Sequence, residues 1–351
     1  MLNEIIKSAT VPDVAACPPV RWGILAPGGI ARKFASDVQV TGATVTAVGS
    51  RSLERAETFA DEFGIPAAAG SYEELVARED VDAIYVASPH SHHREHALLA
   101  IDAGKAVLVE KAFTRNAAEA REVIDAAREA NVFVMEAMWS RFLPHMVAAR
   151  ALVANGAIGE VTQIVADHCQ AISHVQRLVD PELAGGALLD LGVYPLSFIH
   201  SVLGVPDSIV TRGSLLETGV DATSTTALNY GDVSAVATTS LRTKSPVRAW
   251  IGGTEGYIDF DRGFYQTTGL EVVRHDGEKV RFQPSYKGRG HDYPIAEASR
   301  CIAEGKLESE IFPLQGTIEV MEIMDEVRRQ LGVRYPNEPS LRPPHPATDA
   351  R

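Results

Sequence analysis

Short apolar runs alternate with helical patterns along residues 20–140 of this chain. The runs are rich in β-branched residues and nearly continuous, as the buried strands of a parallel sheet are. They cover residues 21–25, 44–50, 81–88, 106–111 and 132–137. The helical patterns between them start after N-cap serines such as Ser52 and Ser71 and close at glycines such as Gly64. Repeated strand–helix units of this kind predict an α/β fold with a doubly wound parallel sheet.

The pattern changes near residue 157. Runs that alternate apolar and polar residues are joined by Gly-Asp or Asp-Gly turns, and a long helical pattern closes the sequence at 313–332. This texture predicts a mainly antiparallel sheet with flanking helices, that is, an α+β domain. We therefore expect a flexible leader over residues 1–19, a parallel-sheet domain over 20–142, an α+β domain over 143–336 and a Pro-rich disordered tail over 337–351.

Composition limits the partners of the protein. Its 351 residues suffice for two domains with large cores, and 33 Lys and Arg against 46 Asp and Glu give a formal net charge of -13. This acidic balance disfavours nucleic acid or an anionic membrane as a main partner. No stretch approaches the roughly 18 apolar residues of a membrane span. Three scattered cysteines indicate a reducing compartment, which we take to be the cytoplasm.

A phosphate-binding turn is predicted where the first strand meets the first helix. The residues there are Ala26, Pro27, Gly28, Gly29 and Ile30, one glycine short of the usual Gly-x-Gly-x-x-Gly/Ala fingerprint. Gly28 allows the backbone to approach a pyrophosphate at the helix N-terminus. Ala26 takes the tight-turn position, where a small residue suffices if its φ is negative. We expect a dinucleotide site, with a plain glycine-rich turn as the alternative.

The end of the second strand selects between the two nicotinamide dinucleotides. NAD-selective folds place a carboxylate there to accept the ribose hydroxyls, but this chain has Ser50 and Arg51. Arg51 can form charge-assisted hydrogen bonds to a 2′-phosphate, Ser50 can donate to the same group, and Arg55 lies one helical turn further on. We therefore predict NADP rather than NAD. The alternative is a surface arginine without a role in binding.

Four histidines follow the fourth strand, within residues 87–96. Ser88 and Pro89 are expected to border the nicotinamide side of the cofactor cleft, because ligands bind beyond the carboxyl ends of parallel strands. His92 and His96 are four residues apart, a spacing that would also let them share a metal ion. No carboxylate or cysteine accompanies them in a metal-binding pattern, so we predict no metal site.

Two further groups suit proton transfer. Lys111, preceded by Glu110, ends a buried strand and is expected to point into the crevice, where it can hold a substrate oxygen or shuttle a proton. Asp190 and Tyr194 lie four residues apart in a helical pattern, so both can face one side. An ammonium group, a phenol and a carboxylate suit the proton transfer that accompanies hydride exchange. The structural alternatives are a solvated lysine and a buried Tyr–Asp pair.

Over residues 21–336 the chain resembles the glucose–fructose oxidoreductase / inositol dehydrogenase / rhizopine catabolism family. The motifs are GILAPGGIA, VGSRS, ASPHSHHREHALLAIDAGKAVLVEKAF, MEAMWSRFLP, GGALLDLGVYPL and MDEVRRQLGVRYP. The last three are most similar to the branch of dimeric dihydrodiol dehydrogenases and NADP-dependent D-xylose dehydrogenases. The resemblance implies a Rossmann domain and an open, mainly antiparallel sheet through which chains pair as a homodimer or homotetramer.

The resemblance also implies roles for individual residues. Lys111 and Tyr194 match the catalytic lysine and tyrosine, and Asp190 matches the carboxylate one turn earlier. Cofactor contacts fall on the first-strand turn, on the ends of the next strands and on Glu110 and Lys111. Substrate-pocket residues are His93, which is also placed beside the cofactor, together with Trp139 and Arg141.

Two departures from the family pattern leave the reacting groups in place. Ala112 stands where the family has proline, and Ala26 replaces the first glycine. We expect an enzyme, an NADP-dependent dehydrogenase or reductase. It would move a hydride between the nicotinamide and a CH–OH group of a small polyhydroxylated substrate, such as a D-xylose-like aldose or a trans-dihydrodiol. The alternatives are a non-catalytic NADP-sensing protein and a sugar–sugar oxidoreductase with a tightly held cofactor.

Overall fold

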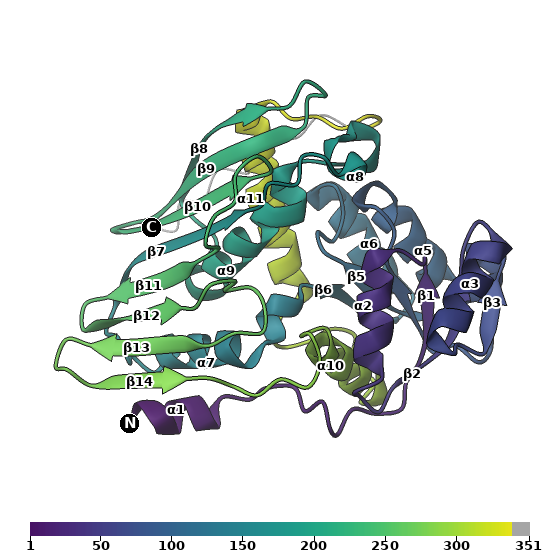
Figure 1. Ribbon diagram of the computed structural model, residues 1–351, viewed down its shortest axis with the longest axis horizontal. Coiled ribbons are helices and arrows are strands. Elements are labelled where there is room, and N and C mark those ends of the chain that lie inside the picture. Colours follow the sequence, from purple (N-terminus) through teal and green to yellow (C-terminus); the bar gives the residue numbers. More distant parts are fainter. Residues whose placement is uncertain (339–351) are drawn as a thin grey trace. The chain divides into compact units, whose positions relative to one another are not determined.

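The computed structural model describes residues 1–338, and the chain divides into two compact units (Figure 1). The parallel-sheet unit comprises Val11–Phe142 and Tyr286–Ile318. Among the described residues, the mixed-sheet unit comprises Met1–Thr10, Leu143–Ser285 and residues 319–338. Each unit is therefore assembled from segments that are distant in the sequence, unlike the continuous domains expected from the sequence.

The first residues of the chain belong to the mixed-sheet unit. They form α1 (Leu2–Ser8), which packs against α7 (Pro144–Ala154). Leu2 and Ile6 are buried on the inner face of α1. The predicted flexible leader is wrong for this helix, because its two apolar side chains find partners in the core.

Residues 286–318 join the parallel-sheet unit rather than the α+β domain predicted for them. They contain α10 (Asp292–Ala303), which packs against α2 (Gly29–Val38) and η2 (Trp139–Phe142). An apolar helix face does not tell which of two sheets it will cover, so the sequence alone does not reveal this return of the chain. Of the predicted disordered tail, residues 339–351 lie outside the described residues.

Six parallel strands form the sheet of the parallel-sheet unit, in the order β3-β2-β1-β4-β5-β6. They are β1 (Arg21–Leu25), β2 (Thr44–Gly49), β3 (Ala67–Ala69), β4 (Ala83–Val86), β5 (Ala106–Glu110) and β6 (Val134–Ala137). The order reverses direction between β1 and β4, and ligands bind beyond the carboxyl ends of the strands at such a switch point. The predicted doubly wound sheet is confirmed.

Several helices accompany these strands in the parallel-sheet unit, and side chains fix where some of them begin. Besides α2, α10 and η2 they are α3 (Leu53–Phe63), α4 (Tyr72–Val76), η1 (His90–His92), α5 (His93–Asp102) and α6 (Ala117–Glu129). Ser52, Ser71 and Asn116 each accept a backbone N–H of the first helical turn. Gly64, with φ +67°, ends α3 in the left-handed conformation. The two serine caps and this glycine stop agree with the sequence prediction.

Eight strands form the sheet of the mixed-sheet unit, in the order β14-β13-β12-β11-β7-β10-β9-β8. They are β7 (Val161–Cys169), β8 (Ser208–Leu215), β9 (Asp221–Tyr230), β10 (Val233–Ser240), β11 (Ala249–Gly253), β12 (Gly256–Phe260), β13 (Leu270–Arg274) and β14 (Lys279–Phe282). Only β7 and β10 pair in parallel, so the sheet is mainly antiparallel, as predicted.

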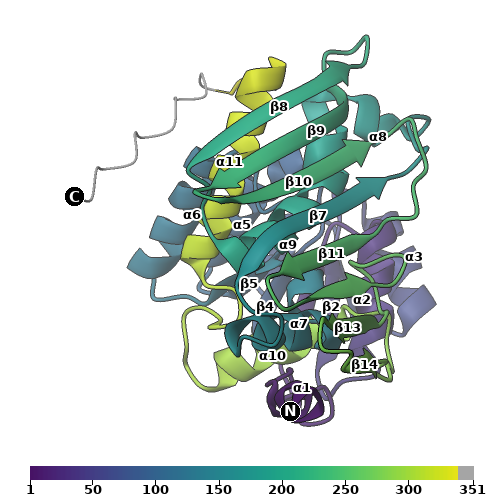
Figure 2. The same cartoon turned by 90° about the vertical axis from the view of Figure 1, so that its left-hand side faces the viewer.

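Helices of the mixed-sheet unit gather on one face of this sheet. Figure 2 looks onto the opposite face, with α7, α9 (Val193–Leu203) and α11 (Leu314–Leu331) behind the strands. Between β7 and α9 the chain forms α8 (Gln176–Val179), η3 (Pro181–Leu183) and η4 (Leu188–Gly192). One sheet face is therefore covered, and the other lacks a covering helix from the described part of this unit.

One segment is long and apolar enough to cross a membrane by length and composition. It runs from Pro181 to Leu203, and 83% of its most apolar window is buried inside the protein. The expectation that no stretch reaches this length is wrong here. The segment is a core element of the mixed-sheet unit, which explains its apolar composition.

Candidate active site

The turn after β1 presents accessible backbone at the start of α2. Gly28 is the N-cap of α2, and a Cβ atom built on Gly28 or Gly29 would meet nothing within 4 Å. Pro27 is buried beneath the turn, whereas Gly29 is exposed and Ile30 is half-buried. The first N–H groups of a helix bind phosphate where nothing blocks its approach. These residues therefore fit the pyrophosphate of a dinucleotide.

The backbone angle of Ala26 differs from the predicted one. Its φ is +73° rather than negative, which is the left-handed region that favours glycine. The Ala26 N–H donates to Gly49 O at 3.1 Å, and Ala26 O accepts the Gly28 N–H at 2.9 Å. Hydrogen bonds on both sides thus hold an alanine in the conformation of the missing fingerprint glycine.

Ala26→Gly is expected to raise the free energy of unfolding by up to about 1 kcal/mol. The left-handed conformation costs a non-glycine residue roughly 1–2 kcal/mol, and the greater freedom of glycine in the unfolded chain cancels about 0.4–1 kcal/mol of the gain. Thermal unfolding of the protein without cofactor measures the change. Ala31→Gly, inside α2, is the control and should destabilise the protein by about 1 kcal/mol. A lower unfolding temperature for Ala26→Gly would contradict this account of the turn.

Arg51, just after β2, and Arg55, in the first turn of α3, both lie near Tyr72 at the start of α4. Burial raises the pKa of the Tyr72 phenol, and the nearby guanidinium groups of Arg51 and Arg55 oppose this rise. Both arginines are exposed, whereas Ser50 is buried and its Oγ accepts the Ser52 N–H at 3.3 Å. The structure thus brings together the cations predicted for a 2′-phosphate and adds Tyr72 beside them.

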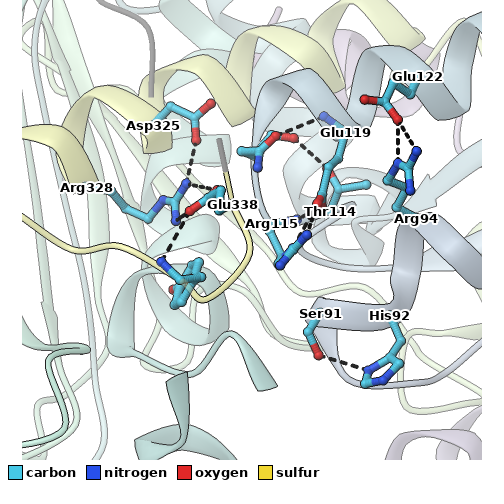
Figure 3. A network of polar contacts seen from close by, with 12 residues as sticks. Ser91, His92, Arg94, Thr114, Arg115, Glu119, Glu122, Asp325, Arg328 and Glu338 are labelled. Atoms are coloured by element: carbon cyan, nitrogen blue, oxygen red, sulfur yellow. Dashed lines mark hydrogen bonds and ion pairs between the residues drawn. The ribbon is translucent and has the colours of Figure 1, made fainter. Parts of the chain in front are cut away.

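The four histidines after β4 divide into two pairs, of which His92 and His96 form one. Their rings stack with centroids 5.6 Å apart, and the His96 ring meets Tyr72 edge-on at 4.6 Å. Ser91 Oγ lies 2.9 Å from His92 Nδ1 (Figure 3). Burial lowers the pKa of His96 to about 4, so this ring is neutral near pH 7. Within residues 1–338, no group of three or more His, Cys, Asp or Glu is arranged to hold a metal ion.

The other pair, His90 and His93, holds the turn that carries Lys111. His90 Nε2 lies 3.2 Å from Lys111 O, and His93 Nδ1 lies 2.9 Å from Ala112 O. His93 is fully buried, with its Nε2 2.8 Å from Ser88 O, and burial lowers its pKa to about 4. Both ring nitrogens of His93 therefore face backbone carbonyls. This placement contradicts the substrate and cofactor contacts predicted for His93.

Lys111 follows the last residue of β5 and is half-buried. Glu110, directly before it, is buried and accepts hydrogen bonds from the Tyr85 hydroxyl and from the Lys111 N–H. Burial raises the pKa of Glu110, and the Lys111 ammonium opposes this rise. The Lys111–Ala112 peptide bond is cis. The Glu110 carboxylate is thus an internal support of the strand end, which differs from the cofactor contact predicted for it.

Trp139 and Arg141 lie in η2, directly after β6, and both are buried. The Trp139 ring packs against His291 with centroids 4.7 Å apart, and the Arg141 guanidinium lies 4.3 Å from the centroid of Phe312. Both partners belong to the segment 286–318. These two predicted pocket residues therefore pack against a segment that lies far from them in the sequence.

In the mixed-sheet unit, Asp190 and Tyr194 occupy two consecutive turns of different kinds. Asp190 lies in η4, a π-helical turn, and Tyr194 lies in the first turn of α9. Arg177 Nη1 donates to Asp190 Oδ1 at 3.1 Å. The Tyr194 ring packs against Tyr265 at 4.4 Å and His168 at 5.1 Å between centroids. The predicted helical pattern therefore contains a π turn before α9 begins, as often happens at functional sites.

The polar neighbours of Tyr194 are not among the residues predicted for the site. Gln170 Nε2 lies 2.8 Å from His168 Nε2 and 3.4 Å from the Tyr265 hydroxyl. The alternation of β7 does contain a signal for His168, since it shares the inner face with Ile164 and Ala166. Tyr265 comes from the loop after β12, and no local pattern indicates its position.

A buried carboxylate fixes the start of η4. Asp221 Oδ2 accepts the Leu188 N–H at 2.7 Å, and burial raises the pKa of Asp221 to about 6. The preceding Gly186 has φ +116°, and a Cβ atom there would lie 2.2 Å from Asp221 Oδ1. Glycine is therefore required at this approach, and the π turn is held in place by Asp221.

Comparison with known families finds matches in both halves of the chain. A model described as an oxidoreductase family with an NAD-binding Rossmann fold, GFO_IDH_MocA, matches residues 20–138. A model described as the GFO/IDH/MocA C-terminal domain matches residues 146–259. Together the two models cover most of the chain, including the turn after β1, Lys111 and Tyr194.

Two curated relatives align over nearly the full chain. The trans-1,2-dihydrobenzene-1,2-diol dehydrogenase of Mus musculus is 38% identical over 333 residues, which cover 91% of this chain and 99% of that protein. The D-xylose 1-dehydrogenase (NADP(+)) of Hypocrea jecorina is 36% identical, with 90% and 93% covered. Both belong to the branch that the sequence motifs resemble.

Solved structures share the arrangement of elements. The aldose-aldose oxidoreductase from Caulobacter crescentus has a TM-score of 0.81 at 23% identity, with 90% of this chain and 98% of that chain covered. The 3-ketoreductase KijD10 from Actinomadura kijaniata, solved with NADP and TDP-benzene, has a TM-score of 0.76 at 25% identity, with 89% and 98% covered. Structures of a Tyr-to-Phe and a Lys-to-Ala variant of KijD10 are also similar.

Proposed function

This chain belongs to the GFO/IDH/MocA family of oxidoreductases, and from this we propose that it is an NADP-dependent dehydrogenase of CH–OH groups. Its substrate is a small polyhydroxylated molecule, either an aldose such as D-xylose or a trans-dihydrodiol. One observation carries the proposal: the chain aligns over almost the full length of two dehydrogenase relatives, and it places Lys111 at a strand end and the Asp190–Tyr194 pair at a π turn. The three buried free cysteines are compatible with a cytoplasmic location.

The residues of the parallel-sheet unit fit a nicotinamide dinucleotide. The N-terminus of α2 receives the pyrophosphate, because Gly28 and Gly29 leave its approach open. Arg51 and Arg55 receive the 2′-phosphate, which supports NADP over NAD. When bound, the cofactor supplies the hydride acceptor or donor. Ser88 and Pro89, beyond the end of β4, border its nicotinamide end.

In the proposed mechanism the chain's own groups handle the proton and the developing charge. Tyr194 as its phenolate accepts the proton of the substrate hydroxyl during oxidation, and as the phenol it returns that proton to the oxygen during reduction. The Lys111 ammonium stabilises negative charge on that oxygen. Asp190, paired with Arg177, orients the hydroxyl and Tyr194. Trp139 borders the substrate.

A substrate panel with NADP and NAD in parallel tests this function. Purified protein is mixed with aldoses, polyols and a trans-dihydrodiol, and the absorbance of the reduced nicotinamide is followed. We expect turnover with at least one of them and a preference for NADP of roughly tenfold or more. Tight NADP binding without any turnover would instead favour a sensor. Turnover that needs a second sugar and releases no reduced cofactor would favour a sugar–sugar oxidoreductase.

We also propose that two chains pair through the uncovered face of the eight-stranded sheet (Figure 2). A row of directly paired residues crosses this face over five strands, namely Val210, Ala227, Val236, Val165 and Trp250. All five side chains are apolar, and none is fully buried in the single chain. Contiguous exposed apolar surface on a sheet marks an interaction site, and a twofold axis would place the row against its own copy.

Val236→Glu is expected to convert the dimer to a monomer, because the twofold axis would bury two like charges near each other. Light scattering after size-exclusion chromatography measures the mass. Val40→Glu, at an exposed valine of the parallel-sheet unit, is the matched control and should leave the mass unchanged. A wild-type protein that elutes as a monomer at micromolar concentration would contradict the proposed pairing.

A further inference from the structure

We infer that Glu136 is a positioning residue that holds the backbone turn presenting Lys111. The inference deepens the proposed function and rests on it. Glu136 lies on β6, where it pairs with Val109 of β5, so its side chain lies close to the strand end that carries Lys111. It is buried, with 2% of its surface exposed. The comparisons and the sequence motifs give this carboxylate no role.

The two carboxylate oxygens of Glu136 connect the turn to another helix. Oε1 accepts the Phe113 N–H at 3.2 Å, and Oε2 accepts the Thr317 hydroxyl at 3.1 Å. Phe113 lies two residues after Lys111, and Thr317 lies in the first turn of α11. Glu136 therefore ties the turn to α11 inside the parallel-sheet unit.

The remaining contacts of the turn come from other elements. The Lys111 N–H donates to Glu110, while His90 and His93 lie against the carbonyls of Lys111 and Ala112. Two carboxylates thus accept the N–H groups of Lys111 and Phe113, and two imidazole rings lie against the carbonyls of Lys111 and Ala112. A backbone turn that is held on several sides presents its side chain in a fixed direction. Misplacement of a catalytic group by about 1 Å can lower the rate 100-fold. Glu136 is the member of this set that links the turn to β6.

The charge on Glu136 decides how strongly it holds the turn. Burial raises the pKa of Glu136 to about 7, and the nearby Glu110 carboxylate adds to the rise. The Thr317 hydroxyl, the Arg141 cation and the Phe113 N–H oppose it. A carboxylate accepts hydrogen bonds about twice as strongly as a neutral carboxyl group. The turn is therefore held most firmly above neutral pH, and protonation of Glu136 loosens it as the pH falls through 7.

Two substitutions separate this role from general support of the fold. In the wild type we expect kcat to fall as the pH falls through 7, which gives the pH profile of kcat an acid limb. Glu136→Gln is expected to lower kcat by about tenfold at pH 8 and to change the Kd for NADP by no more than about twofold. It should also remove the acid limb from the profile. Thr317→Val keeps the carboxylate but removes a contact that lowers its pKa. In that variant the limb should persist and move to higher pH.

Glu297→Gln is the matched control. Glu297 is an equally buried carboxylate of the same unit, bonded to Ser309 and Arg300 rather than to the turn. This variant should retain the wild-type acid limb. Wild-type kcat and an unaltered limb in Glu136→Gln would overturn the inference, and so would an equal loss of the limb in Glu297→Gln.

Thermal unfolding gives a readout that does not depend on turnover. Because burial raises the pKa of Glu136 from 4.5 to about 7, the unfolded chain loses this proton at a lower pH than the folded protein does, so the folded wild type loses stability as the pH rises from 4.5 to 7. The unfolding temperature of Glu136→Gln should therefore rise relative to wild type over this range. A difference that does not change with pH overturns the inference even if the enzyme is active. Absence of turnover with any CH–OH substrate overturns the proposed function, while the pH-dependent difference still reports on Glu136.

Discussion

Tyr194→Phe and Lys111→Ala are each expected to lower kcat by roughly 10²–10⁴-fold while NADP binding is retained. The phenylalanine keeps the ring packing against Tyr265 and His168 but lacks the hydroxyl that exchanges the proton. The alanine removes the cation that stabilises charge on the substrate oxygen. Steady-state turnover and fluorescence titration with NADP measure the two effects separately.

Matched controls exist for both substitutions. Lys105 directly precedes β5, at the opposite end of the strand from Lys111, and its Nζ donates to Arg78 O and Val81 O. Lys105→Ala should leave kcat within about threefold of wild type, because its ammonium group lies away from the carboxyl ends of the strands. Tyr230→Phe, on β9, serves in the same way for the phenol. Turnover retained in both Lys111→Ala and Tyr194→Phe would remove the proposed acid–base pair from the mechanism.

Arg51→Glu is expected to raise the KM for NADP by roughly 100-fold and to leave the KM for NAD nearly unchanged. The substitution removes charge-assisted hydrogen bonds to the 2′-phosphate and introduces a like charge. A glutamate at this strand end also supplies the acceptor that NAD-selective folds place there for the ribose hydroxyls. Parallel kinetics with the two cofactors measure the change in preference.

Arg94→Ala is the control for Arg51. Arg94 lies in the same unit as Arg51, on α5, where it pairs with Glu122 of α6 (Figure 3). It should change neither KM by more than about twofold, since surface ion pairs contribute little. If Arg51→Glu kept the wild-type KM for NADP, Arg51 would be a surface arginine and the cofactor preference would need another cause.

The order of elements in the parallel-sheet unit is predictable because its signals are local. Buried strands read as continuous apolar runs, and Ser52, Ser71 and Gly64 mark helix ends by their own hydrogen bonds or φ. The return of residues 286–318 to this unit carries no such signal. The pairing of Trp139 with His291 joins segments about 150 residues apart, and only the folded chain reveals it.

The residues of the candidate site also differ in whether the sequence predicts their positions. Residues at strand ends, such as Lys111 and Arg51, are predictable because parallel strands align their carboxyl ends. The role of His93 is not predictable from the sequence. Tertiary packing decides whether a histidine faces a ligand or a backbone carbonyl, and residue spacing does not encode that packing. The position of Tyr265 is likewise not predictable from the sequence, since only the tertiary fold brings its loop against Tyr194.

The origin of the transferred hydrogen tests the central claim most directly. The best substrate from the panel is prepared with deuterium on the carbon that bears the hydroxyl, and the reduced cofactor is analysed by mass spectrometry after a single turnover. We predict one deuterium in each molecule of reduced NADP and slower turnover than with the unlabelled substrate. Reduced cofactor without deuterium, or no reduced cofactor at all, would contradict hydride transfer from a CH–OH group.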